Sequence, residues 1–103
     1  MAKKVDNWRI FIKTTTNDKE EQRQVKAIHD CIKGNVLDPD FSMTLVGYSA
    51  EWGNVIETST IVQMSGTKGS VHFKTYSGSI YTADPKDFLG VFCHTVHGDL
   101  KVD

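Results

Sequence analysis

Three residues near the C-terminus carry the side chains most often found in metal sites. His94 lies three residues before His97, and Cys93 lies four residues before His97. On a helix, residues at these spacings lie on one side, so a thiol and two imidazoles could meet there. Zinc needs three or four ligands, and the sequence places no other histidine or cysteine beside these residues. We therefore predict no metal site and no bound cofactor.

A second group of residues could act in a phosphoester hydrolase or nuclease. Such an enzyme needs a base, a group that stabilises charge, and a nucleophile or bound water in one cleft. His72 and Lys74 share one face of a predicted strand, and Glu57 lies on a neighbouring strand. The His94/His97 pair offers an alternative base. The solvent-exposed face of any sheet carries the same residue types. Hydrolysis is therefore kept as the alternative function, and no catalytic residue is assigned.

An aromatic loop offers a different kind of site. Residues 48–54 place Tyr48 and Trp52 among small and polar residues at a turn. Exposed aromatic residues in loops commonly anchor protein interfaces and small-ligand pockets. The opposing interpretation is that Trp52 folds back over the sheet edge as part of the core. We predict a binding site formed by Tyr48 and Trp52, extended by Tyr76 and Tyr81.

The charge of the chain argues against nucleic acid as a partner. Residues 68–73, Lys-Gly-Ser-Val-His-Phe, partly match the basic, glycine and aromatic strand of the RNA-recognition module, but two aromatic positions of that strand are absent. Tyr76 and Tyr81 could still stack on bases. The formal net charge is −1, however, so a phosphate backbone would meet no general attraction.

The elements that must position these residues begin with a strand and a helix. Trp8, Ile10 and Ile12 recur with a period of two, which predicts a first strand over 8–15. Asn17 as N-cap and Gly34 as C-terminal cap then predict a helix between them. Its apolar stripe consists of Val25, Ile28 and Ile32.

A β-meander and a second helix are predicted to follow. Turn residues divide the chain into strands over 41–50, 55–64, 70–76 and 79–82. Asp84 as N-cap and Pro85 at the first helical position predict a helix that ends at Gly98. The order is β-α-β-β-β-β-α. We predict an α+β fold in which a largely antiparallel five-stranded sheet carries two helices on one face.

The long strand predicted over 55–64 carries apolar residues on both faces. Ile56, Val62 and Met64 are expected on one face, and Val55 and Ile61 on the other. Both faces of the sheet would then be partly covered, one by the helices and the other by a partner subunit or a loop.

Length and composition define the wider setting. With 103 residues and 39% hydrophobic content, we expect a single domain over 1–103. The N-terminus lacks the apolar region of a signal peptide, and no apolar run approaches the roughly 20 residues that span a bilayer. We expect a cytoplasmic protein without membrane contact, in which Cys31 and Cys93 are free thiols. An uncovered sheet face and an unpaired edge strand predict a homodimer.

One sequence pattern suggests a biological context. Residues 58–62, Thr-Ser-Thr-Ile-Val, are followed by residues 74–81, Lys-Thr-Tyr-Ser-Gly-Ser-Ile-Tyr, as a strand, a turn and a strand. This pattern resembles small uncharacterised α+β proteins of phages and mobile gene cassettes, which share no assigned activity. The resemblance implies an accessory protein that acts by binding. We therefore predict a non-enzymatic binding module that engages a protein or small ligand.

Overall fold

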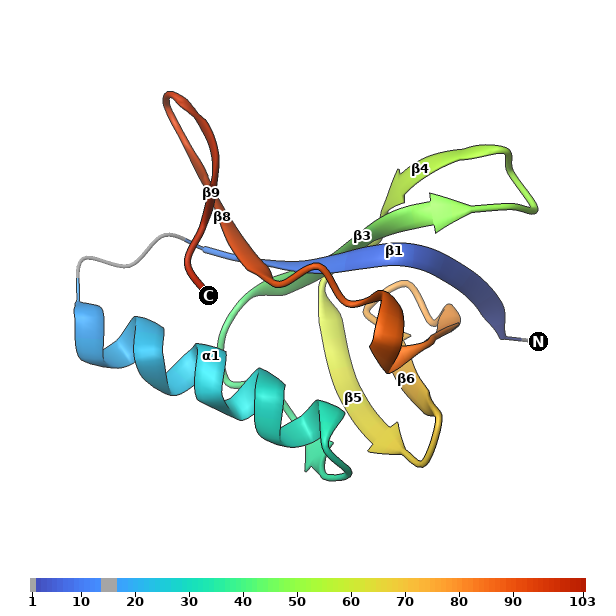
Figure 1. Ribbon diagram of the computed structural model, residues 1–103, viewed down its shortest axis with the longest axis horizontal. Helices are drawn as coiled ribbons and strands as arrows, with labels where there is room; N and C mark the ends of the chain where they lie inside the picture. Colours follow the sequence, from blue (N-terminus) through green and yellow to red (C-terminus); the bar gives the residue numbers. More distant parts are fainter. Residues whose placement is uncertain (1, 14–16) are drawn as a thin grey trace.

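A computed structural model describes residues 2–13 and 17–103. Within these residues, one α-helix accompanies a single mixed sheet of nine strands (Figure 1). The elements in chain order are β1 (Lys3–Ile12), α1 (Asp18–Ile32), β2 (Val36–Leu37), β3 (Met43–Ser49), β4 (Asn54–Glu57), β5 (Ile61–Thr67), β6 (Ser70–Thr75), β7 (Ile80–Ala83), the 3₁₀ turn η1 (Pro85–Asp87), β8 (Val91–Thr95) and β9 (Gly98–Lys101).

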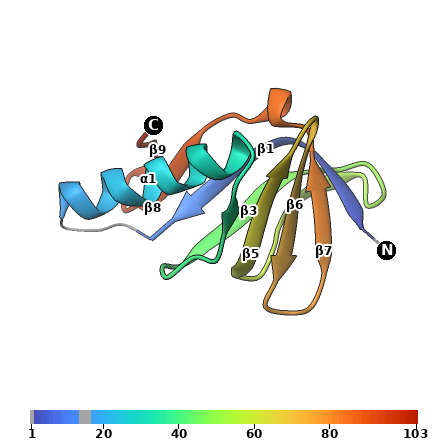
Figure 2. The same cartoon turned by 90° about the horizontal axis from the view of Figure 1, so that it is seen from below.

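β1 is the central strand and organises the whole sheet. Along one edge it pairs antiparallel with β3. Along the other edge it pairs in parallel with two strands, with β7 at residues 3–5 and with β8 at residues 10–12. Between these segments the pairing with β3 shifts register, and Asn7 there has a positive φ of 47°. This bulge bends β1, so the sheet curls instead of remaining flat (Figure 2).

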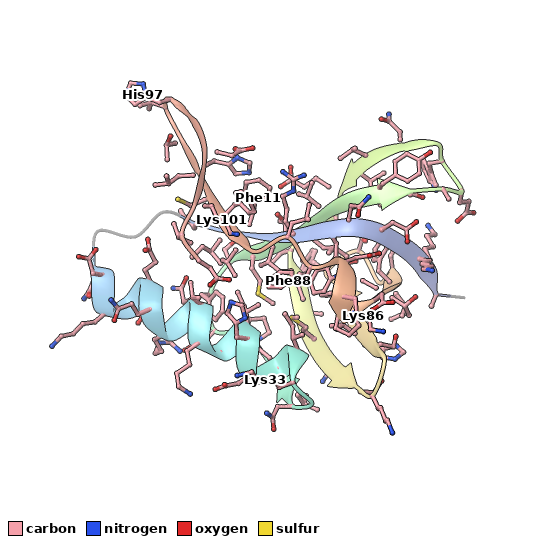
Figure 3. The ribbon with its side chains drawn as sticks, in the orientation of Figure 1. Phe11, Lys33, Lys86, Phe88, His97 and Lys101 are labelled. Carbon is pink, nitrogen blue, oxygen red and sulfur yellow. The ribbon has the colours of Figure 1, made fainter. Side chains whose placement is uncertain are left out.

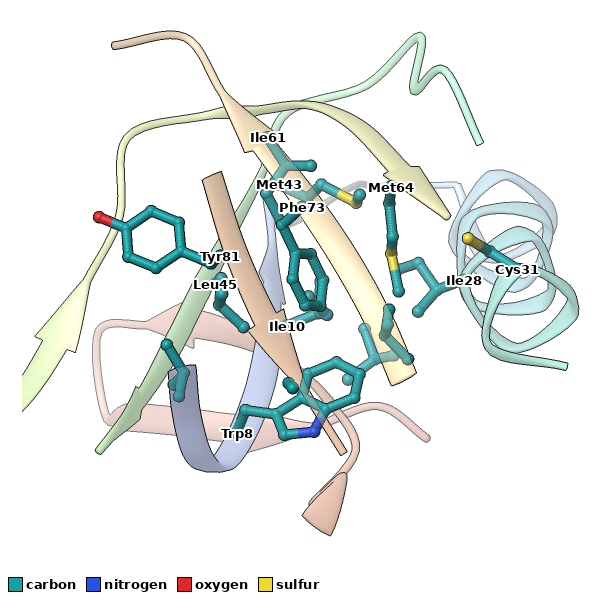
Figure 4. Close-up of a cluster of buried hydrophobic side chains, with 14 of the residues drawn as sticks. Trp8, Ile10, Ile28, Cys31, Met43, Leu45, Ile61, Met64, Phe73 and Tyr81 are labelled. Carbon is teal, nitrogen blue, oxygen red and sulfur yellow. The ribbon is translucent and has the colours of Figure 1, made fainter. Parts of the chain in front are cut away.

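The core fills the concave side of this curled sheet (Figure 4). Trp8 of β1 and Phe73 of β6 meet edge to face with their ring centroids 5.3 Å apart. The Trp8 indole N–H donates to the carbonyl oxygen of Asp84 at 2.7 Å. In Figure 4, Met64 of β5 lies beside Ile28 of α1, so the helix closes one side of the core.

α1 begins as predicted. The Asn17 side chain accepts hydrogen bonds from the backbone N–H groups of Lys19 and Glu20, at 2.9 and 3.3 Å. On the predicted apolar stripe Ile28 is fully buried, and Val25 and Ile32 pack at the margin of the core. The last residues of the predicted first strand, 14–15, lie outside the described residues.

The predicted second helix is wrong. Asp84 does act as an N-cap, accepting from the Lys86 backbone N–H at 2.8 Å, but only the single turn η1 follows. Gly90 then has a φ of 124°, which a right-handed helix does not allow. Beyond it the chain forms the β8–β9 hairpin, in which Val91 and Cys93 alternate with more exposed residues. β-branched and aromatic residues at 91–95 favour a strand there.

The predicted strand 55–64 is two strands. β4 ends at Glu57 and β5 begins at Ile61. Between them Thr58 is buried: its backbone N–H donates to the Leu45 carbonyl, and its hydroxyl accepts from the Leu45 N–H. Thr58 therefore continues the contact with β3 after β4 ends. β5 then crosses to pair with β2 and β6.

The predicted faces of this segment are also wrong in part. Ile61 and Met64 are both buried, whereas Val62 is exposed. The pairing of β5 with β6 shifts register between Ile61 and Gln63, so an extra residue interrupts the alternation of faces.

The predicted architecture of two helices on a five-stranded antiparallel sheet is therefore wrong. The strands of the described chain follow the order β2-β5-β6-β7-β1-β3-β4, with β8 paired to β1 and β9 paired to β8. Two of the pairings are parallel, and the sheet curls into half a barrel. Within the described residues, no helix is long and apolar enough to cross a membrane.

Candidate functional site

Two of the four predicted aromatic residues meet at an open end of the curled sheet. Tyr81 of β7 is the parallel neighbour of Lys3 of β1, and Trp52 lies in the turn between β3 and β4. With Ile56 and Glu57 of β4 they line a pocket of about 170 Å³, which we call the Trp52 pocket. The ammonium nitrogen of Lys3 lies 5.8 Å from the Trp52 ring centroid and 6.0 Å from that of Tyr81. Both distances suit a cation–π contact.

The Trp52 pocket has a fixed inner wall and an exposed lip. Tyr81 is only 9% exposed and belongs to the core cluster. Trp52 is 67% exposed, so the interpretation of this residue as part of the core is wrong. An exposed indole beside a buried phenol ring gives the pocket one adaptable side and one rigid side.

Local sequence explains how Trp52 reaches this position. The turn is closed by Gly53, whose N–H donates to the Ser49 carbonyl at 2.8 Å and whose φ is 67°. The buried Ser49 hydroxyl accepts from the Trp52 N–H at 3.3 Å. Gly47 lets β3 lie close to β1, because a Cβ there would be 2.2 Å from a methyl carbon of Val5.

Tyr48 and Tyr76 lie elsewhere. Ile56 pairs with Gly47 and lines the pocket, so Tyr48, the next residue along β3, points to the opposite face of the sheet. Tyr76 is 82% exposed and follows β6, outside the pocket lining. Lys3 and Ile56 were missed from the sequence, because only the pairing of distant strands places them beside Tyr81 and Trp52.

The predicted hydrolase group does not assemble. His72 and Lys74 share a face of β6 as expected, beside Gln63 and Ile80 at a pocket of about 120 Å³. Glu57 lies on β4, and β7, β1 and β3 stand between β6 and β4 in the sheet order. Glu57 lines other pockets than the one lined by His72 and Lys74, so the three side chains do not form one cleft.

Glu57 instead lies near His94, at a pocket of about 190 Å³. The His94 ring is parallel to the Phe11 ring, with the centroids 4.1 Å apart. Its Nδ1 lies 2.7 Å from a carboxylate oxygen of Asp99, and its Nε2 lies 3.8 Å from one of Glu57. A general base needs one ring nitrogen directed at substrate. Because both nitrogens face carboxylates, this arrangement favours a structural link between β4, β8 and β9.

The other candidate chemical groups are dispersed or enclosed. His97 lies at the tip of the β8–β9 hairpin, away from the body of the protein (Figure 3). Cys31 and Cys93 are free and buried, and burial raises the pKa of the Cys31 thiol, which disfavours its reactive thiolate. Among residues 2–13 and 17–103, no group of three or more His, Cys, Asp or Glu side chains could hold a metal ion.

Known proteins give no further guidance to this site. Comparisons with protein-family models, with curated proteins and with solved structures found no match to this chain. The resemblance to phage and gene-cassette proteins stays a prediction. The function must therefore be inferred from the geometry of the Trp52 pocket.

Proposed function

We propose that this protein is a non-enzymatic accessory module that binds a partner protein by receiving one of the partner's side chains in the Trp52 pocket. The observation that carries this proposal is a solvent-open pocket between two aromatic rings with a lysine ammonium over both. Its volume of about 170 Å³ is below the roughly 300–1,000 Å³ of small-molecule sites. A single side chain matches this volume better than a cofactor does.

The walls of the pocket indicate which side chain it receives. Trp52, Ile56 and Tyr81 present apolar surface, and exposed tryptophan is a frequent anchor of protein interfaces. Lys3 adds a positive charge at the rim. Glu57 also borders the pocket, but its carboxylate accepts a hydrogen bond from the Thr44 hydroxyl at 2.8 Å and lies near His94 on the other face of β4. An apolar partner residue next to an acidic one would fill the pocket and pair with Lys3.

Trp52→Ala tests this proposal. A phage-displayed peptide library selected on the native protein should enrich peptides that carry an acidic residue beside an apolar one. Truncating Trp52 removes the outer wall of the pocket, so affinity for these peptides should fall at least about tenfold, as expected for an interface anchor. Because Trp52 is 67% exposed, its loss should leave the thermal unfolding midpoint nearly unchanged.

Tyr76→Ala is the matched control, since it removes an aromatic ring that is 82% exposed and lies outside the pocket. Peptide affinity should be retained in this variant. Lys3→Met should weaken acidic peptides more than their neutral analogues. Peptides that bind Trp52→Ala as well as the native protein, or a selection that enriches nothing, would contradict the proposal.

A further inference from the structure

β9 presents an open strand edge. Within the described residues it pairs only with β8, and all four of its residues are exposed. In Figure 1 the β8–β9 hairpin extends away from the body of the protein. An unpaired edge is a template for another strand, and a projecting two-stranded hairpin has little stability of its own in water.

The register of the hairpin shows which backbone groups face this open edge. The Val102 N–H donates to the Val91 carbonyl at 2.9 Å, so the backbone groups of Val102 point toward β8. In an antiparallel pair, alternate residues direct their N–H and C=O groups to opposite edges. Leu100 therefore also faces β8. Asp99 and Lys101 direct their backbone groups outward.

We propose that β9 pairs antiparallel with β9 of a second copy of this chain, around a two-fold axis at Leu100, so that one sheet continues through a homodimer. In this register Leu100 lies opposite its own copy. Asp99 lies opposite the partner's Lys101, and Lys101 opposite the partner's Asp99. The outward backbone groups of these residues then meet and exchange hydrogen bonds.

The side chains select this register over its neighbours. Centred on Leu100, the pairing places opposite charges across from each other twice. Centred on Asp99 it would oppose two aspartates, and centred on Lys101 it would oppose two lysines. Leu100, which is 55% exposed in the single chain, is covered by its copy. Such self-complementarity is what an isologous dimer interface requires.

Both charged side chains can reach the partner chain. Asp99 contacts His94 through one carboxylate oxygen, which leaves the other oxygen to face the partner. The Lys101 stem lies over Gly90, close to where a Cβ would stand. Its side chain is exposed, so rotation about its methylene bonds can bring the ammonium to the partner's Asp99.

Disulfide trapping tests the register. Residues directly opposite each other in a non-hydrogen-bonded antiparallel pair have Cα atoms about 4.5 Å apart, which suits a disulfide. In a Cys93→Ser background, which removes the native thiol directly opposite Leu100 on β8, Leu100→Cys should therefore give a covalent dimer on mild oxidation. Val96→Cys in the same background is the control: Val96 is 94% exposed at the hairpin tip, and in this register the two copies of Val96 lie at opposite ends of the paired strands. Equal cross-linking of both variants, or none with Leu100→Cys, would overturn the proposal.

A charge exchange tests the pairing without cross-linking. Asp99→Lys and Lys101→Asp each place like charges opposite each other, so each should weaken the dimer by about tenfold in sedimentation equilibrium. The double variant D99K/K101D should recover native affinity. It also lacks the native Asp99 contact with His94, so only pairing between copies explains recovery. A native protein that sediments at 11.5 kDa throughout the micromolar range, or a double variant without recovery, would contradict the proposed dimer.

Discussion

Glu20 shows how strongly one exposed side chain can be tied at the start of a helix. Its carboxylate accepts hydrogen bonds from the Arg23 guanidinium and the Gln24 amide. The bond from Arg23, assisted by that from Gln24, lowers the pKa of Glu20 from 4.5 to about 2. Arg23 also bonds to Asp40 at 3.0 Å, so the same guanidinium joins α1 to the segment before β3.

This geometry predicts a pH dependence at the residue scale. Because the pKa of Glu20 is lower in the folded state, its ionised form stabilises the fold above pH 4.5, and this contribution is lost as the pH falls from 4.5 to about 2. Thermal unfolding followed by circular dichroism should show a shallower acid decline in Glu20→Gln than in the native protein. Glu21→Gln, one residue along, serves as the control. The same acid decline in native protein and Glu20→Gln would contradict this assignment.

The site could be predicted from sequence only where one residue is informative by itself. Trp52 stands out because it is a large aromatic residue in a turn, and the structure places it at the rim of a pocket. Lys3 looks like any lysine near an N-terminus. Its place over two aromatic rings depends on the parallel pairing of β1 with β7, which local sequence does not encode.

At the scale of elements, α1 and β5 meet at a glycine. A Cβ on Gly66 would lie 2.1 Å from the carbonyl oxygen of Cys31 and 2.9 Å from that of Ile32. Because both atoms belong to the helix backbone, a methyl group there must push the end of α1 away from the sheet. The absence of a side chain at Gly66 thus sets the spacing between helix and sheet.

Gly66→Ala should therefore destabilise the fold by about 3 kcal/mol, the upper part of the usual range for overpacking. Urea unfolding provides the measurement, with Val62→Ala on the same strand as the control. Val62 is exposed, so its truncation should lower the free energy of unfolding much less than Gly66→Ala does. A Gly66→Ala variant as stable as the Val62→Ala variant would contradict this prediction, because α1 could then move away from the sheet without loss of stability.

Element prediction succeeded at α1 and failed after Asp84 for a physical reason. At α1, the N-cap residue and the apolar stripe of helical period both indicate a helix. After Asp84, Phe88, Leu89, Phe92 and Val96 also have helical spacing, and an N-cap and a proline precede them. The alternation of Val91 and Cys93 across a strand was the competing pattern. Tertiary pairing with β1 decides between the two patterns, and Gly90 permits the turn into the strand.

At the scale of the whole molecule, β1 connects the two halves of the sheet, because β3 pairs with one of its edges and β7 and β8 pair with the other. The Trp8 indole of β1 also donates a hydrogen bond to the carbonyl of Asp84, which is distant in the sequence. No described part of the sheet forms a separate core. We therefore expect the protein to unfold in one cooperative transition.

The two tryptophans allow a direct measurement of this cooperativity. Trp8 is fully buried and Trp52 is exposed, so Trp52→Phe leaves a single fluorescent reporter inside the core. In urea, the fluorescence of Trp8 and the far-ultraviolet circular dichroism should change with the same midpoint. Separate midpoints would indicate that the β8–β9 hairpin or α1 unfolds independently of the β1 core.

The central place of β1 also has a consequence for synthesis on the ribosome. β1 is made well before its parallel partners β7 and β8. Until those segments leave the exit tunnel, one edge of an apolar strand stays without its native neighbours. A nascent chain that stalls before residue 80 therefore exposes that edge to chaperones, proteases or other nascent chains. Synthesis of β7 and β8 is what conceals this edge of β1.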